Sequence, residues 1–282
     1  MQEIRKIKEM RSFSQRVKAF GKTIGFVPTM GALHEGHLSL VTEARRKSGV
    51  VVVSIFVNPI QFGPKEDYTH YPRNLARDKK LLKEVGTDVI FVPEVEEMFP
   101  EGFKTYVEVE ALSKVMCGKS RPTHFKGVTT VVAKLFNIVL PDYAFFGEKD
   151  YQQQVIIKQM VKDLNFPVEI ITLPTVREFD GLAMSSRNAY LSEKERKIAP
   201  ILYQALTLAK EEIKKGVRDP QKVIRKMRTL IAQEPAVRLD YITLVHPETL
   251  EELKVIRGRV LIALAAYLGK ARLIDNLVAE AN

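Results

Sequence analysis

Residues 50–57, Val-Val-Val-Val-Ser-Ile-Phe-Val, form an almost unbroken apolar run. A strand with one solvated face would alternate apolar and polar residues, whereas this run is apolar at almost every odd and even position. It therefore predicts a central strand of a parallel sheet that helices cover on both faces. Parallel strands need long crossover connections, so helices should alternate with strands along the chain.

This alternation is present in the first 175 residues. Strands are expected at 23–29, 50–57, 88–92, 142–146 and 168–172, and helices at 35–48, 73–86, 127–140 and 150–164. Right-handed connections between these elements give an α/β fold with an open, doubly wound parallel sheet of the Rossmann-like type. Ligands of such a sheet bind outside the carboxyl ends of its strands.

A different pattern follows the polar run 180–191. Helices are expected at 193–215 and 220–233, and strands at 238–245 and 259–266, with an alternation over 240–245 that indicates one wet face. We therefore expect a Rossmann-like domain over 1–175 and a smaller α+β domain over 176–282. The polar run suits a hinge or lid, and we expect the second domain to cap a bound ligand and exclude water.

Composition limits the classes of protein that fit. With 282 residues, of which 45% are hydrophobic and 28% charged, the chain is long enough for two domains with cores. Its longest apolar run, 260–268, is shorter than the roughly 18 residues that a membrane-spanning helix needs. Residues 1–13 show no secretory signal. A single cysteine, Cys117, is typical of a reducing compartment. We expect a cytoplasmic location and no membrane partner.

The net charge of +10 raises the question of a nucleic-acid partner. The 44 Lys and Arg residues are, however, interleaved with 34 acidic residues, as in 79–84 and 193–197. Such runs are typical of solvated helix faces, and no known nucleic-acid-binding module is visible. The sequence predicts no nucleic-acid partner, and the excess positive charge suits small anionic substrates.

Two histidines, His34 and His37, directly follow the strand expected at 23–29. At this spacing both rings lie on one face of the first turn of a helix. A turn from strand to helix presents unpaired backbone N–H groups and the positive end of the helix dipole, which favour a phosphate. Gly31 and Gly36 would leave room for a nucleotide. So short a motif also fits a structural role, and its spacing is not that of the zinc-protease motif.

Polar clusters follow three of the expected strands. They are Asn58-Pro59-Ile60-Gln61-Phe62 after 50–57, Gly147-Glu148-Lys149-Asp150-Tyr151-Gln152-Gln153 after 142–146, and Met184-Ser185-Ser186-Arg187-Asn188 past 168–172. Each alone fits a turn. Together, at the carboxyl edge of one sheet, they would supply amides for hydroxyl and carboxylate groups and two cations for phosphates.

These motifs, in this order, resemble the pantothenate synthetase family, also called pantoate–beta-alanine ligases. The resemblance covers almost the whole chain and rests on residues 28–37, 54–62, 71–73, 145–153 and 184–188. It implies a core of the class I synthetase and nucleotidylyltransferase type, a smaller C-terminal domain, ATP as a substrate, magnesium and a cytoplasmic homodimer.

The reaction that the resemblance implies is the ATP-dependent condensation of (R)-pantoate with beta-alanine. Pantoate would form a pantoyl adenylate and release pyrophosphate, and beta-alanine would then displace AMP to give pantothenate. Catalysis would depend on positioning and on preorganised positive charge. The implied catalytic residues are His34, His37, Lys149 and Arg187, with His37 as the proton donor and the other three binding the phosphates.

The implied ATP contacts extend over four segments. Ser185 and Ser186 would donate hydrogen bonds to phosphates, Asp150 would hold the ribose and the Val176 backbone the adenine edge. The whole set is Met30, Gly31, Ala32, Leu33, His34, Glu35, Gly36, His37, Gly147, Glu148, Lys149, Asp150, Val176, Met184, Ser185, Ser186 and Arg187.

Gln61 and Gln153 match the family's pantoate-binding glutamines, with Met30 and Phe62 as apolar contacts. Asn58 and Gln61 would position beta-alanine. Buried amides without partners are costly, which favours a functional role for the glutamines. For Met30 and Phe62, simple core packing stays an open alternative. The metal ligands stay unknown, and the neighbourhood of Tyr71 and Pro72 is one candidate for the dimer surface.

Two other classes of protein share some of these features. A nucleotidylyltransferase that keeps the nucleotide in its product would use the same His-x-Gly-His core. An RNA-binding relative of the synthetases would use the basic surface and bind with a steep salt dependence. Neither explains the two glutamine-containing clusters.

Overall fold

The structure, a computed structural model, describes residues 1–64 and 66–281. The chain forms two compact units. Unit 1 comprises Met1–Ser113, Arg121–Glu148 and Gln153–Pro174, and unit 2 comprises Lys114–Ser120, Lys149–Gln152 and Thr175–Asn282. Both units are discontinuous in sequence, whereas the expected domains 1–175 and 176–282 are continuous. Those expected boundaries stay a prediction.

Unit 1 contains a six-stranded parallel sheet in the order β1-β4-β3-β2-β5-β6. Its strands are β1 (Gln2–Ile4), β2 (Ile24–Thr29), β3 (Val50–Ile55), β4 (Val89–Phe91), β5 (Tyr143–Gly147) and β6 (Glu169–Leu173). The α/β class, the parallel sheet and the five expected strands are confirmed, with ends shifted by a residue or two. The short edge strand β1 was not expected, because three residues are too few to show a period.

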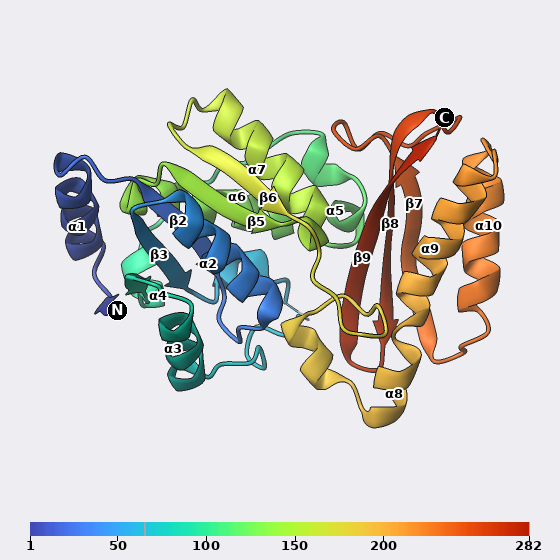
Figure 1. Cartoon of the computed structure of the whole chain (residues 1–282), viewed down its shortest axis with the longest axis horizontal. Coiled ribbons are helices and arrows are strands. Elements are labelled where there is room, and N and C mark those ends of the chain that lie inside the picture. Colours follow the sequence, from blue (N-terminus) through green and yellow to red (C-terminus); the bar gives the residue numbers. More distant parts are fainter. Residues whose placement is uncertain (65, 282) are drawn as a thin grey trace. The chain divides into compact units, whose positions relative to one another are not determined.

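Helices cover both faces of this sheet (Figure 1). The helices are α1 (Ile7–Ala19), α2 (Glu35–Lys47), α3 (Leu75–Glu84), α4 (Val95–Met98), α6 (His124–Val139) and α7 (Tyr151–Asp163), of which α7 has its first two residues in unit 2. Two consecutive residues of β2 point to the two layers. The ring of Phe26 meets Phe136 of α6 edge-on at 6.5 Å, whereas Val27 packs in a cluster with Val41 of α2.

The order of the strands reverses between β2 and β5. From β2 the chain proceeds to β3 and β4 on one side, and β5 and β6 lie on the other. In open parallel sheets this reversal opens a crevice at the carboxyl ends of the two strands, where ligands bind. The turn after β2 is therefore in the position that the fold favours for a site.

Unit 2 contains an antiparallel sheet of β7 (Val237–Val245), β8 (Gly258–Leu268) and β9 (Ala271–Ala281). Helices α9 (Ile201–Lys214) and α10 (Pro220–Ile231) pack against each other and on this sheet (Figure 1). Apolar residues of both layers form one core that includes Leu206, Met227 and Ile262. The expected α+β character of the C-terminal region is confirmed.

The single helix expected at 193–215 is wrong. The structure has α8 (Glu193–Ile198) and then α9, which begins after Pro200. Proline has no N–H with which to continue the helical hydrogen bonds, so the helix is interrupted there. The strand β9 was missed because Asp275 and Asn276 disturb its apolar alternation. In the described part of the chain, no helix has both the length and the apolarity to cross a membrane.

Candidate active site

The turn between β2 and α2 has an unusual backbone. Gly31 and Ala32 have positive φ angles of 81° and 50°. A Cβ atom on Gly31 would lie 3.0 Å from Oδ2 of Asp78 and 3.1 Å from Cγ2 of Ile55. The backbone angle and these neighbours already require glycine here, so Gly31 needs no ligand to explain it.

Asp78 on α3 holds this turn in place. Its side chain is buried, with 1% of the residue exposed, and its carboxylate accepts hydrogen bonds from the N–H groups of Ala32 and Leu33, both at 2.9 Å. The neighbouring Arg77 donates to the carbonyl of Leu33 at 2.8 Å. Sequence analysis missed both residues, because no local motif connects α3 with a turn more than 40 positions earlier.

His34 and His37 form a reciprocal cap at the start of α2. Nδ1 of His34 accepts a hydrogen bond from the Gly36 N–H at 3.2 Å, and Nδ1 of His37 accepts one from the His34 N–H at 3.4 Å. The two ring centroids are 4.1 Å apart. A ring that accepts through Nδ1 is neutral and carries its proton on Nε2. Both imidazoles are therefore held as Nε2–H donors.

The expectation of unpaired N–H groups in this turn is wrong. Ala32, Leu33, His34 and Gly36 donate to the side chains just described, and Gly31 donates to Oγ1 of Thr29 at 3.1 Å. Side chains from α3 and from the turn itself satisfy these donors, as helix ends require. An anion here would meet imidazole side chains rather than a nest of bare amides.

The cluster after β3 contains two connected amides. Nδ2 of Asn58 donates to Oε1 of Gln61 and to the carbonyl of Gly127, both at 3.0 Å. Nε2 of Gln61 lies 3.0 Å from Sδ of Met30. Both amides are buried, and Oδ1 of Asn58 has no hydrogen-bond partner among the described residues. The structure therefore brings Met30, Asn58 and Gln61 together as expected and leaves a buried acceptor for a donor from outside.

Three further residues, absent from the sequence analysis, support Gln61. Its backbone carbonyl accepts from Arg121 at 3.4 Å and lies 3.0 Å from Nδ1 of His124. Arg121 also forms an ion pair with Glu66. Burial is the largest influence and opposes ionisation of Glu66, but the hydrogen bonds and charge of Arg121, a backbone hydrogen bond from the Gly63 segment and the nearby His124 together hold the pKa of Glu66 below its ordinary value. The only sequence signal was two basic residues at the start of α6, Arg121 shortly before the helix and His124 as its first residue.

Phe62 belongs to an aromatic cluster. Its ring centroid lies 5.5 Å from that of Tyr68 and 6.1 Å from that of Tyr71. Core packing therefore explains much of its position. Tyr71 is itself buried, with 6% exposed, so of the pair considered as a dimer surface only Pro72 presents appreciable area.

Lys149 and Asp150 lie in a short 3-10 helix, Glu148–Asp150, and both belong to unit 2. Their charged groups are 3.7 Å apart, and the carbonyl of Lys149 accepts a hydrogen bond from the side chain of Asn276 at 2.9 Å. Gly147, Glu148 and Gln153, from the same sequence cluster, belong to unit 1.

The cluster Met184–Asn188 does not directly follow a strand of the parallel sheet, contrary to expectation. After β6 the chain enters unit 2 and forms a β-bridge between Arg177 and Ala183, with the Met184 N–H donating to the carbonyl of Val176 at 3.0 Å. Ser185 then caps the 3-10 helix Ser186–Tyr190 by accepting from the Arg187 N–H at 3.2 Å. This hairpin, rather than a strand end, positions the serines.

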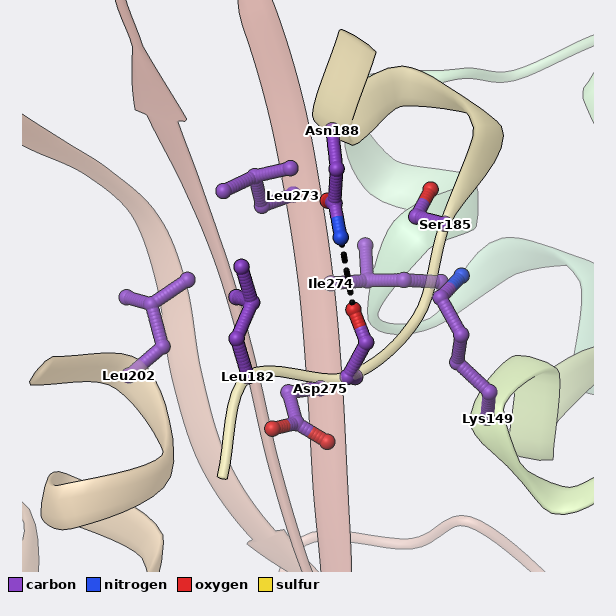
Figure 2. A pocket seen from close by; sticks show the side chains of 9 residues that line it. Lys149, Leu182, Ser185, Asn188, Leu202, Leu273, Ile274 and Asp275 are labelled. Atoms are coloured by element: carbon purple, nitrogen blue, oxygen red, sulfur yellow. Dashed lines mark hydrogen bonds between the residues drawn. The ribbon is translucent and has the colours of Figure 1, made fainter. Parts of the chain in front are cut away.

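A pocket in unit 2 joins two of these segments (Figure 2). Its empty space, part of it open to solvent, is about 240 Å³. Polar side chains of Lys149, Ser185, Asn188 and Asp275 line it, with Leu182, Ala183, Leu202, Leu273 and Ile274 as the apolar walls. Asn188 donates to the carbonyl of Ala183 at 3.1 Å and so closes the hairpin over the pocket. Lys149 and Ser185, both expected to bind phosphates, are thus brought together.

Comparison with known proteins identifies the family. The family model for pantoate-beta-alanine ligase matches residues 2–278. The chain belongs to the pantoate-beta-alanine ligase family. The pantothenate synthetase of Caldicellulosiruptor bescii is 59% identical over 278 residues, which cover 99% of each chain. The resemblance inferred from the sequence motifs is confirmed, and this member of the ligase family is an enzyme.

Solved structures of this ligase family agree. The pantothenate synthetase from Thermus thermophilus is 50% identical, with a TM-score of 0.94, and the match covers 98% of this chain and 99% of that one. The pantoate-beta-alanine ligase from Francisella tularensis, in complex with beta-gamma ATP and beta-alanine, is 38% identical with a TM-score of 0.83 and coverage of 99% and 97%.

Proposed function

We propose that this ligase condenses (R)-pantoate with beta-alanine to pantothenate, consumes ATP, and releases AMP and pyrophosphate through a pantoyl-adenylate intermediate. The observation that carries the proposal is the match of the family model over residues 2–278. The complex of the Francisella tularensis relative with beta-gamma ATP and beta-alanine supports these two substrates.

The chemistry explains why a nucleotide is needed. A carboxylate is a poor acyl donor, so its oxygen first attacks the α-phosphate of ATP in line with the departing pyrophosphate. The amine of beta-alanine then attacks the activated carbonyl and displaces AMP. Negative charge spreads over the phosphate oxygens in the first step, so the protein contributes positioning and preorganised donors.

We assign the phosphate donors of unit 1 to His34 and His37. Each Nδ1 accepts a hydrogen bond from a backbone N–H, so the ring proton lies on Nε2. That N–H can donate to a phosphate oxygen. In this proposal both rings bind the phosphates, and His37 donates its Nε2–H hydrogen bond to the oxygen on which negative charge develops. The remaining contacts from this turn are Met30, Gly31, Ala32, Leu33, Glu35 and Gly36.

Unit 2 would supply the full positive charges. We assign the phosphates to Lys149 and Arg187, with hydroxyl donors from Ser185 and Ser186. The pocket that contains Lys149 and Ser185 supports this grouping. Asp150 would hold the ribose and the Val176 backbone the adenine, with Gly147, Glu148 and Met184 as further contacts.

Pantoate has two hydroxyls and a carboxylate around an apolar centre, so its pocket needs amides beside an apolar wall. We assign these roles to Gln61 and Gln153, with Met30 and Phe62 as the wall. The hydrogen bond from Asn58 to Gln61 orients the Gln61 amide before pantoate arrives. The buried Oδ1 of Asn58, which has no hydrogen-bond partner within residues 1–64 and 66–281, is suited to accept from the ammonium of beta-alanine.

Magnesium, a homodimer and a cytoplasmic location complete the proposal. Within residues 1–64 and 66–281, no three His, Cys, Asp or Glu residues are grouped to hold a metal ion. Magnesium bound with a nucleotide needs few protein carboxylates, because phosphates and waters supply most of its ligands. When bound with ATP, it would neutralise phosphate charge beside Lys149 and Asp150.

We propose that the C-terminal domain closes over the nucleotide and excludes water from the adenylate, which would otherwise hydrolyse. Small-angle scattering with ATP and pantoate should then show compaction. An unchanged radius of gyration would contradict domain closure, but it would be compatible with a local lid formed by residues 180–191.

Product analysis tests the reaction itself. The protein is incubated with ATP, magnesium, pantoate and beta-alanine, each omitted in turn, and the products are identified by mass spectrometry. Pantothenate and free AMP should appear only in the complete mixture, whereas pyrophosphate should also form without beta-alanine. A product that retains the nucleotide would indicate a nucleotidylyltransferase and overturn the proposal.

A further inference from the structure

Asp275 and Asn276 are adjacent residues of β9, and Asp275 lines the pocket of unit 2. Asp275 is 3% exposed, and its carboxylate makes two hydrogen bonds with the guanidinium of Arg177, at 2.7 and 2.9 Å. A buried carboxylate needs such a partner, because an unpaired charge in this environment is costly. Burial raises the pKa of Asp275, whereas Arg177 and Lys149 oppose that rise.

Arg177 extends this link to the hairpin that carries the serines. Its guanidinium also donates to the carbonyls of Gly181 at 3.0 Å and Asn276 at 3.3 Å, and it lies 4.1 Å above the ring of Tyr203. Gly181, at the hairpin turn, has a φ of 91°. Through this one side chain, β9 holds the hairpin 177–183 that closes one side of the pocket.

Asn276 holds the segment that carries Lys149. Its Nδ2 donates to the backbone carbonyl of Lys149 at 2.9 Å. Lys149, Asp275 and Ser185 all line the same pocket (Figure 2). Consecutive residues of one strand therefore connect to the two segments from which the phosphate-binding groups of unit 2 come.

We propose that Asp275 and Asn276 are positioning residues for the nucleotide: Asn276 places Lys149, and Asp275, through Arg177, keeps the hairpin and its serines in register with Lys149. This inference rests on the proposed function, in which Lys149 and Ser185 bind ATP phosphates. Neither Asp275 nor Asn276 contacts substrate in this account.

The physical reason lies in the flexibility of lysine. A lysine ammonium is a point charge on a four-carbon chain, and ordering such a side chain is costly in entropy. Fixing the backbone of Lys149 and the hairpin 177–183 reduces the volume that the Lys149 ammonium can occupy. A misplacement of about 1 Å can lower a rate by about 100-fold, so a hydrogen bond that acts only on the backbone of Lys149 has a measurable effect.

A double-mutant cycle between Asn276 and Lys149 tests the proposal. Asn276→Ala should lower kcat/KM for ATP by about 10- to 100-fold, the range that a misplaced binding group produces, and leave the KM for beta-alanine unchanged. In a Lys149→Ala background the same substitution should have no further effect, because the group that it positions is absent. Asn276→Asp keeps the size but removes the donor, and it should behave as Asn276→Ala does.

Glu212→Gln is the matched control. It removes the carboxylate that pairs with the exposed ammonium of Lys226; this ion pair connects α9 and α10 of the same unit and shares no residue with the pocket. It should lower the melting temperature and leave kcat/KM for ATP unchanged. Asp275→Asn should lower both the melting temperature and kcat/KM for ATP. Saturating ATP should restore part of the rate of pantothenate formation.

The outcomes separate this inference from the proposed function. If Lys149→Ala is impaired but Asn276→Ala and Asn276→Asp keep the wild-type kcat/KM, only the inference is overturned. Equal loss on substituting Asn276 in the wild-type and Lys149→Ala backgrounds would also overturn it, since the residue would then act on the fold in general. A fully active Lys149→Ala enzyme would overturn both.

Discussion

The carboxylate of Asp78 accepts a hydrogen bond from the backbone N–H of Ala32 at 2.9 Å, and Ala32 has a left-handed φ of 50°. For a residue with a side chain this conformation costs about 1–2 kcal/mol. The same carboxylate binds the next N–H, that of Leu33. Helix α3 thus compensates the strain of the turn that presents His34.

Replacing Asp78 tests this relationship. Asp78→Asn keeps the shape but leaves one acceptor oxygen for two N–H donors, so one buried donor loses its partner at a cost of about 1–3 kcal/mol. We expect a lower melting temperature and a higher KM for ATP. The exposed carboxylate of Asp163 serves as control, since Asp163→Asn should alter neither. A variant of Asp78 with unchanged ATP kinetics would mean that α3 does not shape the site.

His37 should act on the first chemical step. His37→Ala should reduce adenylate formation by about 10²- to 10³-fold, which is typical of removing one donor to developing charge. Pantoate-dependent pyrophosphate release measures this step alone. The melting temperature should fall only slightly, by the loss of one capping contact. His70→Ala, at an exposed loop histidine, is the control, and normal pyrophosphate release by His37→Ala would remove this ring from the mechanism.

Gln61 should discriminate between the two substrates of the first step. Its side chain binds Asn58 and Met30, whereas its backbone carbonyl is held separately by Arg121 and His124. Gln61→Ala should therefore keep the turn and weaken pantoate much more than ATP, as calorimetry with each ligand would show. Equal losses of both affinities would indicate a structural residue.

The ion pair of Glu66 with Arg121 should make stability depend on pH. The pKa of Glu66 in the folded protein lies below its ordinary value of 4.5. Its contribution to stability is therefore present above about pH 4.5 and is lost as the pH falls through the lower, folded pKa. The melting temperature of Glu66→Gln should lie below that of the wild type at pH 7, and the difference should shrink below pH 4.5. A constant difference would contradict this origin.

The local sequence pattern was enough to predict structure where a residue's conformation depends mainly on its neighbours along the chain. The two-sided apolar run of β3 predicted a buried parallel strand, and the spacing of His34 and His37 predicted adjacent rings. The same reasoning failed where one or two residues interrupt a regular pattern, or where a helix ends inside an apolar stretch. Pro200 divided a helix that the apolar pattern had shown as continuous, and the polar pair in β9 concealed a strand.

By itself the sequence determined the α/β class, the order of its elements and, through motifs spread over its length, the family, because periodicity and motif spacing are properties of the linear chain. Only the tertiary structure decided that the Asp78 carboxylate accepts from the amides of the turn after β2, and that Arg121 and His124 hold the carbonyl of Gln61. It also decided that Asn276 donates to the carbonyl of Lys149 and that Asp275 lines the same pocket. These partners lie far apart in sequence. A hydrogen bond depends on distance and angle in space, and those are set when the sheets and helices pack.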